Sequence, residues 1–206
     1  MKRFASYIWI CIGLSLTHCS DKSGSDPEKF EGTVIESEVQ KFGIDTITDK
    51  LENPWGIAFL PDNRILVTER KGEIRIIENG KLLDEKIEGV PAVFAQGQGG
   101  LLDIKLHPDF SSNGWIYLTY SKPGEGGAAT TLARTKLSGN AFTDFQELFS
   151  AQPYVNSDLH FGSRVVFDGK GNIFLSCGER GTKENAQTLE NHLGKIIRLK
   201  EDGSVP

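Results

Sequence analysis

Three stretches of the chain share one pattern of hydrophobic and polar positions. Each holds an alternating apolar run, a turn led by aspartate, and a second run of β-branched and aromatic residues: GIAFLPDNRILVTERKG (56–72), DIKLHPDFSSNGWIYLTYSKPG (103–124) and SRVVFDGKGNIFLSCGERG (163–181). Alternation predicts half-buried strands, and a turn between two such runs predicts a β-hairpin. Each stretch is therefore expected to form a hairpin that ends in a polar loop containing glycine.

Further apolar runs predict strands that extend these hairpins into sheets. They lie at 73–77, 130–137 and 195–199, with connecting or outer strands at 84–93 and 143–149. A helix-like pattern occurs only at 184–193. The unit recurs after roughly 45 to 60 residues, a spacing typical of β-propeller blades. The predicted fold class is all-β, a β-propeller of which this chain holds about three blades.

Three blades leave the ring of a propeller open. Such a ring buries its sheet faces only when it closes, and an uncovered terminal repeat exposes an apolar face. The sequence ends at EDGSVP, directly after a predicted strand and turn. We expect a truncated sequence; the other interpretation is a homodimer in which two half-rings complete each other.

Composition favours an ordinary globular domain without a nucleic-acid partner. Of the 206 residues, 38% are hydrophobic and 25% are charged, and the formal net charge is −5. Nucleic-acid binding would require a basic patch, which this charge balance does not favour.

The N-terminal segment predicts export from the cytoplasm. Lys2 and Arg3 precede an apolar stretch at 4–16 that has the length of a signal peptide and is short for a membrane span. The pattern resembles a bacterial lipoprotein signal at 1–19 in which Cys19 carries the lipid; an ordinary secretory signal is the alternative. Both predict an extracytoplasmic protein, in the periplasm or lipid-anchored to the cell envelope, with no other contact to a membrane.

A flexible linker at 20–32 and one domain at 33–206 are expected to follow the signal. The domain keeps a single thiol, Cys177, so it has no internal disulfide to hold it together. Cys177 lies in an apolar run and is expected to be a small core residue.

A few polar residues stand out as candidates for chemistry. His160 lies just ahead of a predicted innermost strand, beside the channel where propellers place their sites, and imidazole suits proton abstraction near neutral pH. Gln98 lies in a glycine-rich loop and has an amide that both donates and accepts hydrogen bonds. Glu179 and Arg180 lie one loop away from His160. The pair Glu69 and Arg70 is expected to be solvated.

Four motifs together resemble the glucose/sorbosone dehydrogenase family, in particular its soluble aldose sugar dehydrogenases. They are LENPWGIAFLPDNRILVTERKGEIRII, GQGGLLDIKLHPDF, LHFGSRVVFDGKGNIFLSCGERG and AQTLENHLGKIIRLKEDGSVP, and the resemblance runs from Glu52 to Pro206. It implies a six-bladed propeller that holds pyrroloquinoline quinone (PQQ) and calcium over its central channel. It also implies oxidation of the anomeric hydroxyl of an aldose sugar to a lactone, with electrons passed to an external acceptor.

The resemblance assigns roles to particular residues. His160 in LHFGSR corresponds to the catalytic base and contacts substrate, and Gln98 in GQGGLLD faces cofactor and substrate. Arg164 and Arg180 correspond to positions that shape the site or meet a cofactor carboxylate, although Arg164 is equally well a structural cation. Leu159 stands where glucose-specific relatives have aspartate, which leaves the sugar open.

The remaining basic contacts to PQQ and the calcium ligands are expected in a second half of the ring, so no metal ligand is assigned here. The competing hypothesis is a non-enzymatic propeller that binds a partner and lacks the cofactor.

Overall fold

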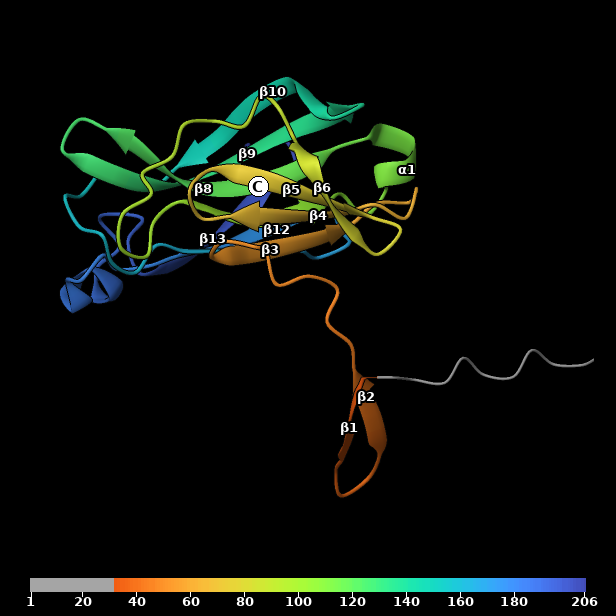
Figure 1. Ribbon diagram of the computed structural model, residues 1–206. Coiled ribbons are helices and arrows are strands. Elements are labelled where there is room, and N and C mark those ends of the chain that lie inside the picture. The colour runs from red at the N-terminus through yellow and green to blue at the C-terminus, as the bar shows by residue number, and fades with distance from the viewer. Residues whose placement is uncertain (1–31) are drawn as a thin grey trace, which may run out of the picture. The chain divides into compact units, whose positions relative to one another are not determined.

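A computed structural model describes residues 32–206, and these residues fall into two units that divide after Asp45 (Figure 1). The first unit contains a small antiparallel hairpin of β1 (Thr33–Glu36) and β2 (Lys41–Ile44). The second is a compact unit from Thr46 to Pro206. The predicted domain at 33–206 takes in the hairpin, whereas the compact unit begins at Thr46. The predicted signal at 1–19, its Cys19, and the linker up to residue 31 lie outside the described residues.

The compact unit consists of three antiparallel sheets, each a meander of strands that follow one another along the chain. The first sheet contains β3 (Pro54–Phe59), β4 (Ile65–Glu69), β5 (Glu73–Glu78) and β6 (Lys81–Lys86). The second contains β7 (Leu101–Leu106), β8 (Ile116–Gly124), β9 (Gly127–Ser138) and β10 (Ala141–Ser150). The third contains β11 (Gly162–Phe167), β12 (Asn172–Cys177) and β13 (Lys195–Lys200). These are propeller blades, so the predicted fold class is confirmed.

Two of the predicted elements are wrong in part. The outer strand of the first sheet ends at Lys86, and 87–93 form a loop with one bridge from Glu88 to Ala141. The helix-like pattern at 184–193 yields only a 3-10 turn, η1 (Lys183–Gln187). No residue of that turn is buried, so no packing compensates the cost of starting a longer helix. The other short helix, α1 (Phe110–Asn113), interrupts the turn between β7 and β8.

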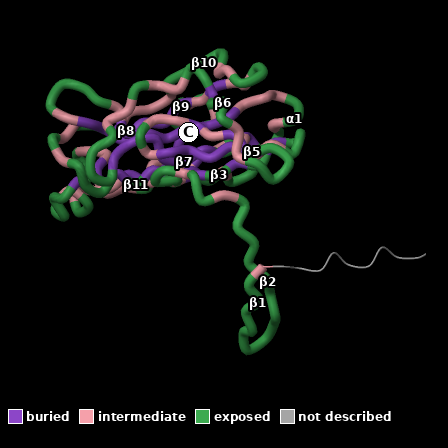
Figure 2. Tube along the Cα trace, viewed as in Figure 1, coloured by how far each residue is buried: buried purple, intermediate pink, exposed green. Residues whose placement is uncertain are grey.

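The three sheets pack face to face, with β7 beside β3 and β4 on one side and beside β11 on the other. One buried cluster joins the first and second sheets and includes Leu66, Ile74 and Leu118. Another joins the second and third and includes Tyr117 and Leu175. Figure 2 shows the buried residues along the strands, with the exposed ones mostly in loops. The first and third sheets thus bury one face each, whereas the second sheet buries both of its faces.

The first strand of each sheet is irregular at the same place. The pairing register shifts between Pro54 and Ile57 in β3, between Leu101 and Ile104 in β7, and between Gly162 and Val165 in β11. An extra residue in one strand of an antiparallel pair re-aims the neighbouring side chains, and such bulges are frequent beside active sites. These three shifts lie where the first strands begin, which is the end of the sheets that carries the candidate site.

Candidate functional site

A cavity of about 370 Å³ opens where the first strands begin. It is lined by residues from the first sheet, from β7 and the loop before it, and from the start of β11 and the loop before it: Trp55, Arg70, Gly97, Gln98, Leu102, His160, Phe161 and Gly162. Trp55, Leu102 and Phe161 give it apolar walls, and Arg70, Gln98 and His160 supply polar groups. Its size and its few convergent polar groups are typical of small-molecule sites. The structure therefore brings together His160 and Gln98, the two residues singled out from sequence.

The backbone of His160 is held in an unusual conformation by its neighbours. Its φ of 50° lies in the left-handed region, which is uncommon for residues other than glycine and is found often at functional sites. The side-chain oxygen of Gln98 accepts a hydrogen bond from the His160 N–H at 2.9 Å. Gly178 lies so close that a Cβ there would be 1.7 Å from the His160 carbonyl oxygen. The glycine of the CGERG motif thus lets the histidine loop rest against the end of β12.

Glu179 fixes the imidazole ring of His160. Nδ1 of His160 and Oε1 of Glu179 form a hydrogen bond. The hydrogen bond from His160 lowers the pKa of Glu179, so this carboxylate is ionised near neutral pH and can only accept. Nδ1 must then carry the shared proton, which leaves Nε2 of the neutral ring as its basic nitrogen. About half of the His160 side chain is exposed, at 47%.

Arg180 is buried, and its guanidinium donates hydrogen bonds to backbone carbonyls. Nε donates to the Leu159 carbonyl at 2.8 Å, and Nη1 donates to the Ala128 carbonyl at 2.7 Å. Nη2 donates to the Ser157 carbonyl, and the guanidinium lies 3.6 Å from the centre of the Phe161 ring. Burial lowers the pKa of Arg180 to about 10. Arg180 therefore braces the loop that carries His160, and it does not line the cavity.

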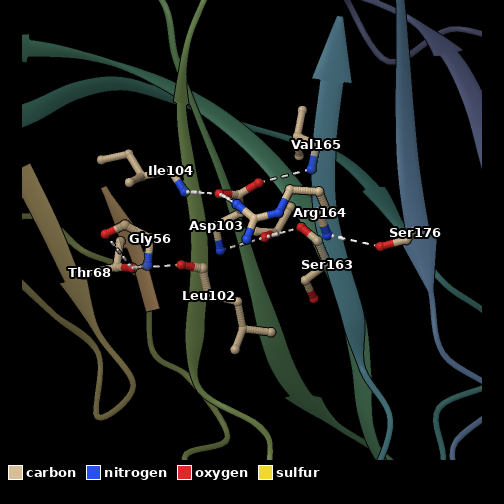
Figure 3. Close-up of polar contacts among 10 residues, drawn as sticks. Gly56, Thr68, Leu102, Asp103, Ile104, Ser163, Arg164, Val165 and Ser176 are labelled. Atoms are coloured by element: carbon tan, nitrogen blue, oxygen red, sulfur yellow. Dashed lines mark hydrogen bonds and ion pairs between the residues drawn. The ribbon is translucent and has the colours of Figure 1, made fainter. Parts of the chain in front are cut away.

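Arg164 pairs with a buried carboxylate. Its Nη1 donates to Oδ1 of Asp103 at 2.7 Å (Figure 3). Its guanidinium lies 4.5 Å from the ring centre of Trp55. Asp103 is 2% exposed, and its second oxygen accepts from the Val165 N–H at 2.9 Å. Burial raises the pKa of Asp103, against the lowering effects of the Val165 hydrogen bond and the Arg164 charge. Arg164 thus joins the second and third sheets and contacts a wall of the cavity through Trp55.

The expectation that Glu69 and Arg70 are solvated is wrong. Glu69 is fully buried, and its Oε1 accepts from the Glu52 N–H at 2.7 Å. Arg70 lines the cavity and donates through Nη1 to the Gly97 carbonyl. The signal that could have found them is topological: the end of β4 pairs with the start of β3, at the end of the sheets that holds His160.

The other histidines of the described part of the chain have structural partners. His107 is 8% exposed, and its Nε2 lies 3.1 Å from Oε2 of Glu201. Nδ1 of His192 accepts from the Gln152 N–H at 2.9 Å. Cys177 is a buried free thiol, as predicted. Among residues 32–206, no three His, Cys, Asp or Glu side chains are grouped to hold a metal ion. None of the helical segments in that range is long and apolar enough to cross a membrane.

Comparison with known proteins identifies close relatives. Residues 51–206 match the profile of the family described as Glucose / Sorbosone dehydrogenase. Aldose sugar dehydrogenase YliI of Escherichia coli (strain K12) is 44% identical over 167 residues, covering 79% of this chain and 45% of that protein. The chain spans about half the length of the curated relatives it matches.

Solved structures agree with this. The apo-form crystal structure of the soluble aldose sugar dehydrogenase from Escherichia coli gives a TM-score of 0.75 at 44% identity, covering 79% of this chain and 48% of that one. The PQQ-bound form of aldose sugar dehydrogenase from Streptomyces coelicolor gives 0.65 at 27% identity, covering 78% and 48%.

Antiparallel meanders packed face to face define part of a β-propeller, and a candidate site lies where their first strands begin. The profile match and the level of sequence identity then specify the family to which this propeller belongs. The chain belongs to the glucose/sorbosone dehydrogenase family.

Proposed function

We propose that this chain forms the histidine-bearing half of a PQQ-dependent dehydrogenase that oxidises the anomeric hydroxyl of an aldose sugar to a lactone. The single observation that carries the proposal is the pairing of His160 with Glu179 at the edge of a cavity that Gln98 also lines. The names of the relatives support aldose as the substrate class and PQQ as the cofactor.

His160 acts as the general base. An ionised Glu179 keeps the shared proton on Nδ1, so that Nε2 is free to take the proton of the anomeric hydroxyl. The imidazolium that results is stabilised by the same carboxylate. A positioned base of this kind accelerates proton transfer by about 10² to 10⁴. When bound, PQQ supplies the quinone that accepts the hydride.

Gln98 positions the base and orients the sugar. Its Oε1 is occupied by the His160 N–H, and no partner for its amide NH₂ is found among residues 32–206. That NH₂ group is available to donate a hydrogen bond to a sugar hydroxyl or to an oxygen of the cofactor. Gln98 thereby couples the place of the substrate to the place of the base.

The cavity suits a flat aromatic acid such as PQQ. Trp55 offers partly exposed apolar surface for rings, whereas Leu102 and Phe161 line the cavity from buried positions. Arg70, Gln98 and His160 supply the polar groups of the lining. Arg180, assigned to the cofactor by resemblance, has each guanidinium nitrogen bonded to a carbonyl, so we propose that it acts by holding the His160 loop. Arg164 does not line the cavity, and it affects the cofactor only by stacking on Trp55. The calcium ligands stay a prediction for the second half of the ring.

The protein is proposed to work outside the cytoplasm, in the periplasm or on the cell envelope, with electrons leaving to an external acceptor. This rests on residues 1–19, read as a lipoprotein-type signal with Cys19 as the lipid-bearing residue. Labelling cells with a radioactive fatty acid tests it: label is expected in the wild type and lost in Cys19→Ser. Label in both would leave only the secretory interpretation.

The proposed function is tested by sugar oxidation in the protein loaded with PQQ and calcium, followed with a redox dye. His160→Ala is expected to lower turnover by a factor of about 100 or more. Glu179→Gln is expected to lower it as well and to shift the pH profile, because an amide cannot stabilise the imidazolium. His192→Ala is the matched control and should keep wild-type turnover. Normal turnover in His160→Ala would reject the base, and failure to bind PQQ would favour a non-enzymatic binding module.

A further inference from the structure

The three arginines around the site differ in what occupies their guanidinium groups. Arg180 is bonded to three carbonyls, and Arg164 is paired with Asp103. Arg70 lines the cavity itself and uses only Nη1, which donates to the Gly97 carbonyl. Among residues 32–206, no carboxylate lies within ion-pair distance of Arg70, and its Nε and Nη2 have no acceptor. Arg70 is thus an uncompensated cation at the cavity wall.

The backbone of Arg70 is held on both sides. Its N–H donates to the Asn53 carbonyl at 3.2 Å, and its carbonyl accepts from the Leu101 N–H at 3.0 Å. Gly100 packs so tightly that a Cβ there would lie 2.0 Å from the Arg70 carbonyl oxygen. The start of β7 is therefore fastened to the end of β4 at this residue. An anchored backbone and a clamped Nη1 reduce the entropy that the guanidinium would lose on binding a ligand.

The nearby carboxylates do not cancel this charge. Glu179 is engaged by His160, and Asp103 by Arg164. Asp158 is exposed and is not among the residues that line the cavity. An anionic group that enters the cavity therefore meets Arg70 as its free cationic partner there.

We propose that Arg70 binds a carboxylate of the ligand in this cavity, while Trp55, the partly exposed apolar side chain of the lining, receives the aromatic rings of that ligand. A guanidinium suits this role because its planar fork can donate two parallel hydrogen bonds to one carboxylate. The inference rests on the proposed function, since PQQ is a planar aromatic tricarboxylic acid. It adds to the site a residue that the sequence pattern had placed in solvent.

The test is PQQ binding to the purified chain, measured by quenching of tryptophan fluorescence and by calorimetry. Arg70→Gln is expected to weaken binding by about 10- to 100-fold, the loss of a hydrogen-bonded charge pair. Arg70→Lys should fall between the two, since it keeps the charge and loses the fork. Arg198→Gln is the matched control, because Arg198 is exposed on β13 and does not line the cavity. It should bind as the wild type does.

The trimethyl ester of PQQ provides the ligand-side control. It keeps the rings and lacks the negative carboxylates, so the wild type, Arg70→Gln and Arg70→Lys are expected to bind it with similar affinity. A urea unfolding curve for each variant establishes that it is folded. If Arg70→Gln is not folded, the ratio of the affinities of Arg70→Lys for PQQ and for the ester decides whether Arg70 binds a carboxylate.

The outcomes separate this inference from the proposed function. Equal PQQ affinity in Arg70→Gln and wild type would overturn the role of Arg70 and leave the proposed dehydrogenase intact. PQQ binding that depends on Arg70, without sugar oxidation in the loaded protein, would support the inference and reject the function. A wild-type chain that binds no PQQ would overturn the inference for this chain.

Discussion

At the scale of single residues, burial decides what Cys177 can do. The thiol is 5% exposed at the end of β12, among the side chains that join the second and third sheets. Burial raises its pKa to about 12 from an ordinary value of 9.0. The folded state therefore holds the thiol proton more tightly than the unfolded chain does. The contribution of the protonated Cys177 thiol to the free energy of unfolding is complete below pH 9, and it is lost as the pH rises from there towards 12.

This sign gives a test in alkaline solution. Between pH 8 and pH 10, the free energy of unfolding of the wild type should fall by about 1 kcal/mol more than that of Cys177→Ala. The alanine variant is less stable at both pH values because of its cavity, but that cost does not change with pH. Urea unfolding at the two pH values measures the difference. Parallel losses in the two proteins would mean that the thiol does not titrate as its burial requires.

Sequence alone identified some residues of the candidate site and missed others. His160 and Gln98 were found because a lone imidazole and a glycine-rich loop stand out, and the structure places both on one cavity. Arg70 was missed because charged residues after a strand are usually solvated, and nothing local tells which end of a sheet carries a site. Arg180 was predicted to bind the cofactor because the sequence does not reveal that backbone carbonyls accept the hydrogen bonds of its guanidinium.

At the scale of the strands, a repeated hydroxyl contact fastens each sheet to the next. Thr68 accepts from the Gly56 N–H at 2.8 Å and donates to the Leu102 carbonyl of the second sheet at 2.6 Å. Thr119 repeats this: it accepts from the Asp103 N–H at 2.9 Å and donates to the Ser163 carbonyl of the third sheet at 2.8 Å. Figure 3 shows the polar contacts around Asp103. In each case one hydroxyl satisfies two buried backbone groups at a bulge.

Ser176 occupies the corresponding place in the third sheet. Its hydroxyl accepts from the Arg164 N–H at 3.0 Å, but it has no acceptor among residues 32–206. The neighbouring Leu175 and Cys177 face the second sheet, so alternation directs Ser176 to the opposite face. The hydroxyl of Ser176 therefore satisfies one backbone group of its own sheet and joins it to no other sheet within the described residues.

The difference between Thr119 and Ser176 predicts unequal costs. Thr119→Val should lower the free energy of unfolding by about 2 kcal/mol, since it leaves a buried N–H and a buried carbonyl without partners. Ser176→Ala should cost less than about 1 kcal/mol, because it removes a single bond at an exposed face. Thr119→Ser keeps the hydroxyl and should recover most of the loss. Chemical denaturation at equilibrium measures all three, and similar losses at both positions would refute the proposed fastening.

The hairpins could be predicted from sequence because period-two alternation and aspartate turns are local signals. The strand at 172–177 follows the alternation directly, whereas the strand at 65–69 is buried almost throughout. The end of β6 at Lys86 could not be predicted, because the residues after it remain apolar for a different reason: Ile87 and Val90 pack into the first core cluster from a loop. Tertiary packing produced a strand-like pattern without a strand.

At the scale of the whole compact unit, two sheet faces lack a packing partner among the described residues. On the first sheet, Ala58 faces the second sheet, while Ile57 and Phe59 point to the other side with 54% and 66% of their surface exposed. On the third sheet, Val166 and Ile196 are likewise 53% and 68% exposed. Exposed aliphatic and aromatic groups on a sheet face usually mark a surface that binds another element. The outer faces of the first and third sheets therefore carry apolar side chains, as the faces buried between the sheets do.

These faces should make the isolated chain bind hydrophobic dyes and associate with itself. The double variant Val166→Thr/Ile196→Thr keeps β-branched residues, so its strands should form as before, but it removes apolar surface from the third sheet. Fluorescence of anilinonaphthalene sulfonate is expected to fall by about twofold or more, and sedimentation velocity should show less association at high concentration. Leu189→Thr is the matched control: Leu189 is 95% exposed outside the sheets, and its loss should change neither measurement. The contrary outcome is a control that lowers dye fluorescence and self-association as far as the double variant does. In that case both signals would come from scattered apolar residues, and the outer face of the third sheet would have no special role.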